Sequence, residues 1–478
     1  MSLFCKLRRL WRRAWAGRSA AILVCGAGRP RHAGQSRLLL LLLLLLLFGS
    51  TAAVAQRWRL PLRPVPLRLA QRPLLPDELF PLPGMPEPAP FQFEHARRKQ
   101  AVIPMQVQRN LLVVSFKLNG VGPLNFVLDS GVGMTILTDP NVADSLKLLR
   151  GQPYRVVGAG GENTGLLAHE IEGVRLSAGP VVAPNLRVLI LSEDVLNLSG
   201  YVGMPIHGIL GSELFRSFVV SVEPEAFRLV LTEPSRYRPP RGRRWARLPL
   251  TIIAHKAYLN LPVQVTDSLA LSLRLVLDTG AGHALSLEAG SAPHLIVPPQ
   301  RLRADLGRGL TGFIRGYLGR VSALQLGRYR LPAVLTSFPD SNQVHQRATV
   351  PRNGNIGFEL LKRFTMVVDY PHQRLLLRPN NLYREPFEHD MCGIDLIAAG
   401  PDFRRYVVQR VTPDSPAATA GLLANDEILS INFMPANIFS LTQISRILHS
   451  VDGRALLLVV RRADGELRTT TLHLKRQI

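Results

Sequence analysis

The chain contains an internal repeat, which limits its fold more than any other feature of the sequence. Residues 123–136 align with residues 272–285 at an offset of 149, and both segments place an Asp and two glycines after an apolar run. Residues 211–231 align with residues 357–377 at an offset of 146, with eight identities over 21 positions. Repeated landmarks in the same order predict one fold unit that occurs twice in the chain.

Short apolar runs rich in Val and Leu, separated by Gly, Pro and Asn, fill both copies of the repeat. Runs of this kind predict β-strands, so the fold class is expected to be mainly β. After about residue 388 the pattern changes to strands interspersed with short helical segments, of which residues 441–448 are the most clearly amphipathic. This last stretch has the size of one small domain.

The N-terminal segment has the pattern of a secretory signal. Residues 38–48 are wholly apolar, too short for a comfortable membrane span, and are followed by the small residues Ala53, Val54 and Ala55. This pattern predicts cleavage before Gln56 and export of the remaining chain, with an uncleaved membrane anchor as the alternative.

The cysteines indicate where the exported chain resides. Cleavage would remove Cys5 and Cys25 and leave Cys392 alone, so no disulfide could form within the mature chain. We therefore expect the periplasm or cell envelope of a bacterium.

The net charge of +24 first suggests a nucleic-acid ligand. Nine of the Lys and Arg residues lie in residues 1–55, which contain no acid, and the remaining +15 is spread along the chain. The densest basic run, residues 238–247, contains two prolines and is interpreted as a solvated linker, with a phosphate-binding patch as the alternative. No nucleic-acid partner is expected, and membrane contact is expected only through an uncleaved signal.

Two Asp-Ser/Thr-Gly motifs carry the expected chemistry, and each follows an apolar strand at the same point of its repeat: Asp129, Ser130 and Gly131 in the first, and Asp278, Thr279 and Gly280 in the second. Either motif alone could be an ordinary turn that satisfies its own backbone. If a pseudo-twofold axis relates the repeats, however, the two carboxyls meet, share one proton and activate one water between them. The hydroxyls of the Ser and Thr are suited to hold the two turns together.

The duplicated motif resembles the pepsin and retropepsin family of aspartic peptidases over roughly residues 98–235 and 246–380. In that family an apolar-apolar-Gly segment packs beneath each catalytic turn, and Ile209-Leu210-Gly211 occupies that place in the first copy. The second copy has Asn355 where the family has an apolar residue. The resemblance also implies flaps, whose candidate glycines could instead belong to plain hairpin turns: Gly158, Gly160, Gly307 and Gly309.

The C-terminal region resembles a PDZ domain of the kind attached to bacterial envelope proteases, through residues 415–418, 420–422 and 426–432. PDZ domains bind an extended peptide by strand addition and hold its terminal carboxylate in a loop of backbone N–H groups. The candidate loop includes Gly393, Ile394, Asp395 and Leu396. A purely structural PDZ domain is the alternative.

The expected organisation is a signal peptide (1–55), a proline-rich linker (56–97), a first lobe (98–235), a basic linker (236–247), a second lobe (248–380) and a PDZ domain (388–478). The expected activity is aspartic-type endopeptidase hydrolysis of a peptide or protein substrate, with a PDZ ligand as a second partner. No cofactor and no metal are expected. The alternative is a non-catalytic peptide-binding envelope protein that retains the peptidase fold.

Overall fold

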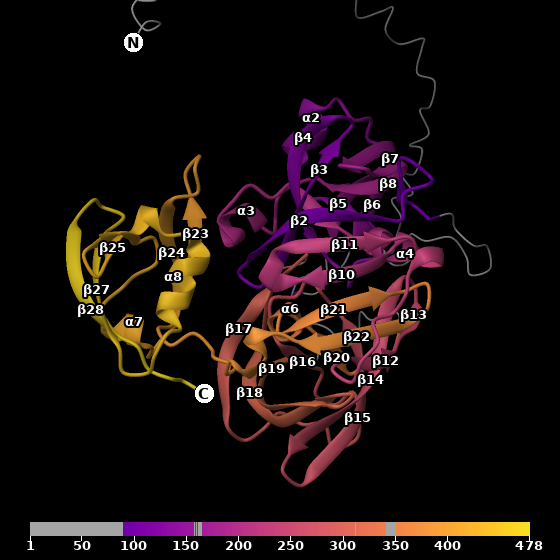
Figure 1. Cartoon of the computed structure of the whole chain (residues 1–478). Helices are drawn as coiled ribbons and strands as arrows, with labels where there is room; N and C mark the ends of the chain where they lie inside the picture. The colour runs from indigo at the N-terminus through magenta and orange to yellow at the C-terminus, as the bar shows by residue number, and fades with distance from the viewer. Residues whose placement is uncertain (1–88, 157, 159, 161–164, 311, 341–349) are drawn as a thin grey trace, which may run out of the picture. The chain divides into compact units, whose positions relative to one another are not determined.

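The computed structural model describes residues 89–156, 158, 160, 165–310, 312–340 and 350–478 (Figure 1). Its strands form sheets of 14, eight and six strands, which confirms the mainly β fold expected from the sequence. The predicted signal peptide and residues 56–88 of the proline-rich linker lie outside the described residues. Within the part of the chain that the structure describes, no helix is both long and apolar enough to cross a membrane.

The first repeat supplies most of the 14-stranded sheet. Its elements are β1 (Gln92–Phe93), β2 (Gln100–Gln108), β3 (Leu111–Leu118), β4 (Val121–Leu128), β5 (Ile136–Leu137), α2 (Pro140–Ser145), β6 (Pro153–Val156), β7 (Leu166–Ala178), β8 (Val181–Leu191), α3 (Leu198–Val202), β9 (Gly208–Leu210), α4 (Glu213–Ser217), β10 (Val219–Glu223), η2 (Pro224–Ala226), β11 (Arg228–Thr232) and η3 (Pro234–Arg236).

The second repeat forms the eight-stranded sheet and adds three strands to the 14-stranded one. Its elements are β12 (Ala246–Pro249), β13 (Thr251–Ile253), β14 (Lys256–Thr266), β15 (Leu269–Leu277), β16 (Leu285–Leu287), β17 (Arg301–Gly309), β18 (Gly312–Leu326), β19 (Tyr329–Pro339), β20 (Gly354–Ile356), α6 (Phe358–Leu361), β21 (Phe364–Asp369), β22 (Arg374–Pro379) and η5 (Asn381–Arg384).

The remaining elements build a separate six-stranded sheet: β23 (Ile394–Ala399), β24 (Arg405–Val411), α7 (Pro416–Thr419), β25 (Glu427–Ile431), β26 (Met434–Pro435), η6 (Ala436–Ile438), α8 (Leu441–Leu448), β27 (Ala455–Arg461) and β28 (Leu467–His473). Helix α8 begins with a capping box, in which Ser440 and Gln443 bond each other's backbone N–H groups. Its apolar residues, among them Ile444 and Leu448, are buried in a core of their own.

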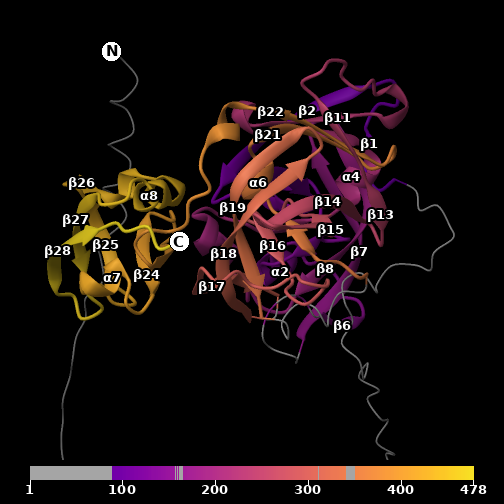
Figure 2. The ribbon, with the colours of Figure 1, turned by 90° about the horizontal axis from the view of Figure 1, so that it is seen from below.

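The two lobes share a ladder of antiparallel strands in the order β12, β22, β21, β10, β11 and β2 (Figures 1 and 2). At its centre β10 pairs with β21, with Val220 opposite Val368 and Val222 opposite Met366. These residues are related by the repeat offset of 146, so each pairs with the counterpart of the other. This reciprocal pairing is the one that a twofold axis between the two lobes would produce.

The basic linker is more ordered than the sequence suggested. Arg241, Arg243 and Arg244 are exposed, as expected of a solvated segment. Tyr237 and Trp245, however, pack against the buried cluster of Val219, Val367 and Leu376, which spans the shared ladder. The two aromatic side chains bury enough apolar surface to hold the linker on the sheet.

Arg363 fixes the segment that follows the second lobe. Its side chain is 1% exposed, bonds Glu359 at 2.9 Å and donates to the backbone carbonyls of Leu382, Glu385 and Pro386. Its guanidinium also lies 3.8 Å from the ring centroid of Phe387. A buried guanidinium needs such partners for its donors, so one side chain ties residues 382–387 to the lobe.

We expect Arg363→Ala to release this segment and to destabilise the two-lobed unit by about 3 kcal/mol, because a buried ion pair loses one partner. Limited proteolysis should then cut faster between residues 380 and 388, and the released fragment 388–478 should melt cooperatively, since its core is separate. Arg328→Ala removes an exposed arginine and serves as the control. Equal cleavage rates in both variants would contradict the role given to Arg363.

Candidate active site

Each aspartate motif leaves a buried strand at a point fixed by a second strand. In the first lobe β9 lies parallel to β4 and antiparallel to β5, and the Asp129 N–H donates to the Leu210 carbonyl at 2.9 Å. In the second lobe β20 lies in the same way between β15 and β16, and the Asp278 N–H donates to the Ile356 carbonyl at 3.0 Å. Strand β9 in the first lobe and strand β20 in the second therefore fix the position at which each aspartate turn begins.

Four hydrogen bonds join the two turns. The Ser130 hydroxyl accepts from the Thr279 N–H at 3.1 Å and donates to the Leu277 carbonyl at 2.7 Å. The Thr279 hydroxyl accepts from the Ser130 N–H at 3.0 Å and donates to the Leu128 carbonyl at 2.8 Å. Both side chains are fully buried, so the hydroxyls fix the turns against each other without competition from water.

The glycines of the motifs leave the space that the opposite carboxyls occupy. A methyl group on Gly131 would lie 2.9 Å from Cγ of Asp278, and one on Gly280 would collide with the carboxyl of Asp129. Each carboxyl is thus packed against the turn of the other lobe, and any side chain at either glycine would separate the pair.

The environment of the pair favours a retained proton. Desolvation, with the adjacent Asp278 as a further cause, raises the pKa of Asp129 to about 8. Nearby, the Tyr370 hydroxyl donates to the Ser130 carbonyl at 3.5 Å, and its ring stacks on Phe215 with centroids 5.6 Å apart. Burial raises the pKa of Tyr370 well above the usual value, and the nearby Asp129 raises it further. Sequence reasoning did not find Tyr370, because it lies far from the Asp-Ser/Thr-Gly motifs in the sequence and aligns with Pro224 in the first copy.

Two polar residues, Asn355 and His283, lie beside Asp278, and the sequence analysis assigned a role to neither. Asn355 donates its side-chain N–H to Asp278 Oδ2 at 2.6 Å, and the imidazole of His283 lies 3.2 Å from Asn355 Oδ1. A histidine in the turn after the second motif is expected from its position to be exposed, but the His283 side chain is partly buried, and burial lowers its pKa. The signal available in the sequence was the departure of Asn355 from the apolar pattern of the first copy.

The candidate flap glycines lie after β6 and along β17. Gly158 follows β6, and a methyl group placed on it would lie 2.9 Å from Cβ of Leu310, at the tip of the β17–β18 hairpin. Gly307 and Gly309 belong to β17 itself, and Gly160 has a positive φ of 135°. The rest of the first candidate flap, residues 157, 159 and 161–164, lies outside the described residues.

Two amide donors at the start of the candidate PDZ loop are bonded by Asp390. The N–H groups of Cys392 and Gly393 donate to the two carboxylate oxygens of Asp390, at 3.1 and 2.5 Å. Ile394 and Leu396 belong to β23, an edge strand of the sheet, and Asp395 on the same strand pairs with Arg410 at 2.7 Å. An internal carboxylate thus bonds two of the N–H groups at the position where PDZ domains hold a terminal one.

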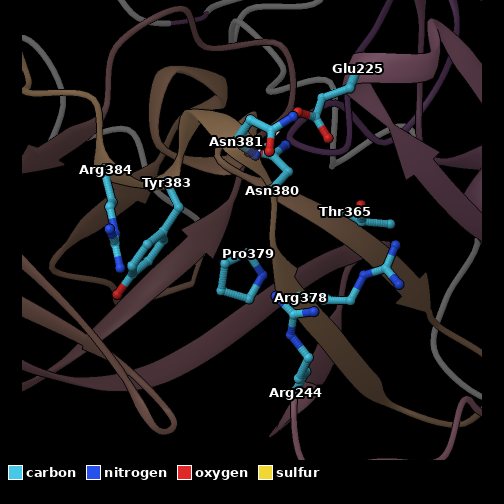
Figure 3. Close-up of a pocket in the computed structure, with 9 residues that line it drawn as sticks. All are labelled: Glu225, Arg244, Thr365, Arg378, Pro379, Asn380, Asn381, Tyr383 and Arg384. Atoms are coloured by element: carbon cyan, nitrogen blue, oxygen red, sulfur yellow. Dashed lines mark hydrogen bonds between the residues drawn. The ribbon is translucent and has the colours of Figure 1, made fainter.

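A cavity of about 530 Å³ lies elsewhere, and Figure 3 shows the side chains around it: Glu225, Arg244, Thr365, Arg378, Pro379, Asn380, Asn381, Tyr383 and Arg384. It shares no residue with the aspartate turns. Glu225 accepts from the Asn381 N–H at 3.1 Å, and Arg378 lies over the ring of Trp245. These contacts are structural, so the cavity adds nothing to the chemistry of the aspartates.

Comparisons with known proteins match the two parts of the chain separately. Residues 114–214 match the aspartyl protease family, and residues 407–462 match the PDZ domain family. No curated protein matches the sequence of the chain.

Three solved structures are similar to parts of the chain. Basic 7S globulin from soybean shares 12% identity, covering 60% of this chain and 96% of its own, with a TM-score of 0.34. An aspartic proteinase from Irpex lacteus shares 14%, covering 60% and 99%, with a TM-score of 0.35. A photosystem II D1 C-terminal processing protease shares 24%, covering 18% and 22%, with a TM-score of 0.17.

The first family match spans the Asp129 turn together with β9, the strand that lies beneath it. The second repeat reproduces this arrangement with Asp278 and β20, and the second match falls on the separate six-stranded sheet. The chain therefore carries an aspartyl protease domain, followed by a C-terminal PDZ domain.

Proposed function

We propose that this protein is an exported aspartic endopeptidase that hydrolyses peptide bonds with one water held between Asp129 and Asp278. The observation that carries the proposal is the pairing of the two turns, in which hydroxyls from both lobes fix two carboxyls against each other. A binding protein needs no such pair, since two close carboxyls repel each other unless a proton is shared.

The arrangement supports acid and base roles for the two carboxyls. The ionised carboxyl takes a proton from the water, whose oxygen forms a bond to the peptide carbonyl carbon. The protonated carboxyl gives its proton to the carbonyl oxygen, so a neutral tetrahedral adduct forms. Collapse of this adduct breaks the C–N bond: the amine nitrogen gains the proton that the first carboxyl took from the water, and a hydroxyl of the adduct returns a proton to the second carboxyl. The chain needs no covalent intermediate and no cofactor for these steps.

The PDZ domain is proposed to recruit the substrate or a partner as an extended peptide that adds a strand to β23, an edge strand of its sheet. We further propose that the protein acts in the periplasm or cell envelope of a bacterium, on the basis of the apolar run at 38–48 and the small residues before Gln56. N-terminal sequencing of the exported chain tests this location, and recovery of residues 1–55 on the membrane-bound chain would support an anchor instead.

We expect Asp129→Asn and Asp278→Asn each to lower cleavage of a peptide library by at least about 100-fold, because one water needs both carboxyls. The double variant should be hardly worse than either single one, as for residues that act as a unit. Cleavage read by mass spectrometry between pH 3 and 8 provides the measurement.

The control is Asp267→Asn, which changes an exposed aspartate in the turn between β14 and β15. It should leave the rate unchanged. If either active-site variant cleaves at the wild-type rate, the paired assignment fails and the alternative of a peptide-binding protein is favoured.

The raised pKa of Asp129 predicts a particular dependence of stability on pH. The folded chain holds this proton up to about pH 8, whereas an unfolded aspartate releases it near 4. The free energy of unfolding therefore falls as the pH rises through this window. Asp129→Asn should lack that fall, so its advantage in melting temperature over the wild type should grow from pH 4 to pH 8. Parallel melting curves across this range would contradict the raised pKa.

The occupied PDZ loop predicts little preference for free C-termini. The wild type should bind library peptides equally whether they end in a carboxylate or an amide, because Asp390 already bonds the loop amides. Asp390→Ala should favour the free carboxylate by roughly tenfold in fluorescence-polarisation titrations, a difference equivalent to one charge-assisted hydrogen bond. Asp464→Ala, which removes an exposed acid from the turn between β27 and β28 and lies outside the loop, should show no such gain. A strong carboxylate preference of the wild type would contradict this reading.

A further inference from the structure

The two halves of the active site differ at one position that the repeat makes directly comparable. In the first lobe Ile209 lies opposite Val127 in the strand pairing, two residues before Asp129. In the second lobe Asn355 lies opposite Val276, again two residues before the aspartate. The same site beneath the turn therefore holds an apolar side chain in one lobe and an amide in the other.

A second difference lies beside the first. The residue five positions after the aspartate is Met134 in the first lobe and His283 in the second. Met134 is 4% exposed and belongs to an apolar cluster that also contains Val156. His283 instead lies within hydrogen-bonding distance of Asn355. The polar pair thus occurs only in the second lobe of the repeat.

The direction of these hydrogen bonds follows from the groups involved. The amide nitrogen of Asn355 can only donate, so its N–H donates to Asp278 Oδ2, and the Asn355 carbonyl oxygen faces His283. His283 must then donate through Nε2–H. The imidazole fixes the amide so that its donor points at the carboxylate and its acceptor points away.

We propose that His283 and Asn355 act as positioning residues that hold Asp278 as the ionised member of the pair and thereby place the shared proton on Asp129. The inference rests on the proposed function, because it assigns the base and acid roles within that site. Asp278 becomes the group that takes the proton from water, and Asp129 becomes the group that protonates the peptide carbonyl oxygen.

The contacts of Asp129 agree with this assignment. Its Oδ1 accepts from the Gly131 N–H at 2.7 Å, which a protonated carboxyl can still do through its carbonyl oxygen. Its Oδ2 is then free to carry the proton toward Asp278. Desolvation and the neighbouring Asp278 raise the pKa of Asp129, so that the proton is retained at neutral pH.

Few other titratable groups face the pair. Lys256 on β14 acts on Asp129 and favours its ionised form, while Tyr370 lies beneath both carboxyls and stays neutral because burial raises its pKa. Burial lowers the pKa of His283, so the imidazole remains neutral and keeps the donor that orients Asn355. Neither Lys256 nor Tyr370 distinguishes the carboxyls in the way that a direct hydrogen bond from Asn355 does.

The repeat supplies the substitutions that test this inference. Asn355→Ile and His283→Met install the residues of the first lobe, and Ile209→Asn places an amide beneath Asp129 as the matched control. His283→Gln keeps a side-chain donor without a titrating ring. The full chain, labelled with ¹³C at the aspartate carboxyls, is titrated by NMR, with resonances assigned from Asp129→Asn and Asp278→Asn.

In the wild type we expect Asp278 to remain ionised over the pH range in which Asp129 is protonated. Asn355→Ile should raise the ionisation midpoint of Asp278 by about one pH unit, which is a tenfold change in its acid dissociation constant. The acid limb of kcat/KM should move by the same amount. His283→Met should act in the same direction, His283→Gln should restore most of the wild-type behaviour, and Ile209→Asn should bring the two midpoints closer together.

The inference is overturned if Asn355→Ile leaves both midpoints unchanged while thermal unfolding shows an intact fold. It is also overturned if the wild-type proton resides on Asp278. Since the titration needs no substrate, it separates this failure from failure of the proposed function. Two wild-type carboxyls that titrate independently near pH 4 would reject both.

Discussion

The hydrogen bonds between Ser130 and Thr279 are the constraint on which the rest of the site depends. Each hydroxyl uses its donor and its acceptor on the other lobe, so neither turn can move without breaking bonds in a buried environment. A lost bond there leaves a polar group without a partner and without water, which costs more than the bond itself contributes. The carboxyls can therefore be held close despite their repulsion, because the turns beneath them are fixed.

The repeated segments of the sequence allowed much of the fold, and the pairing of the two aspartates, to be predicted. The alternation of apolar strands with turn residues predicted the mainly β fold, and the two aspartate motifs at matching offsets indicated that Asp129 and Asp278 would meet. Local pattern also predicted α8, whose bounds agree with the amphipathic segment 441–448. These features can be predicted because they depend on residues that are close together in the sequence or on segments that occur twice in it.

What the sequence could not reveal depends on contacts between distant residues. The surroundings of His283 are set by Asn355, 72 residues away, and the Asp-Thr-Gly motif before His283 gives no sign of them. Likewise, the order of the basic linker comes from Tyr237 and Trp245 packing on strands of both lobes. Arg363 was not recognised as an anchor because its partners are mainly backbone carbonyls, which any sequence could supply.

The reciprocal pairing of β10 with β21 also bears on how such a chain could arise. Val220 faces Val368 and Val222 faces Met366, which is how two identical subunits would pair their own copies of one strand. The present interface is thus a homodimer contact contained within a single polypeptide. Covalent fusion removes the concentration dependence of that assembly. It also lets the two halves diverge, which an assembly of identical subunits cannot do, and one half could acquire Asn355 while the other kept Ile209.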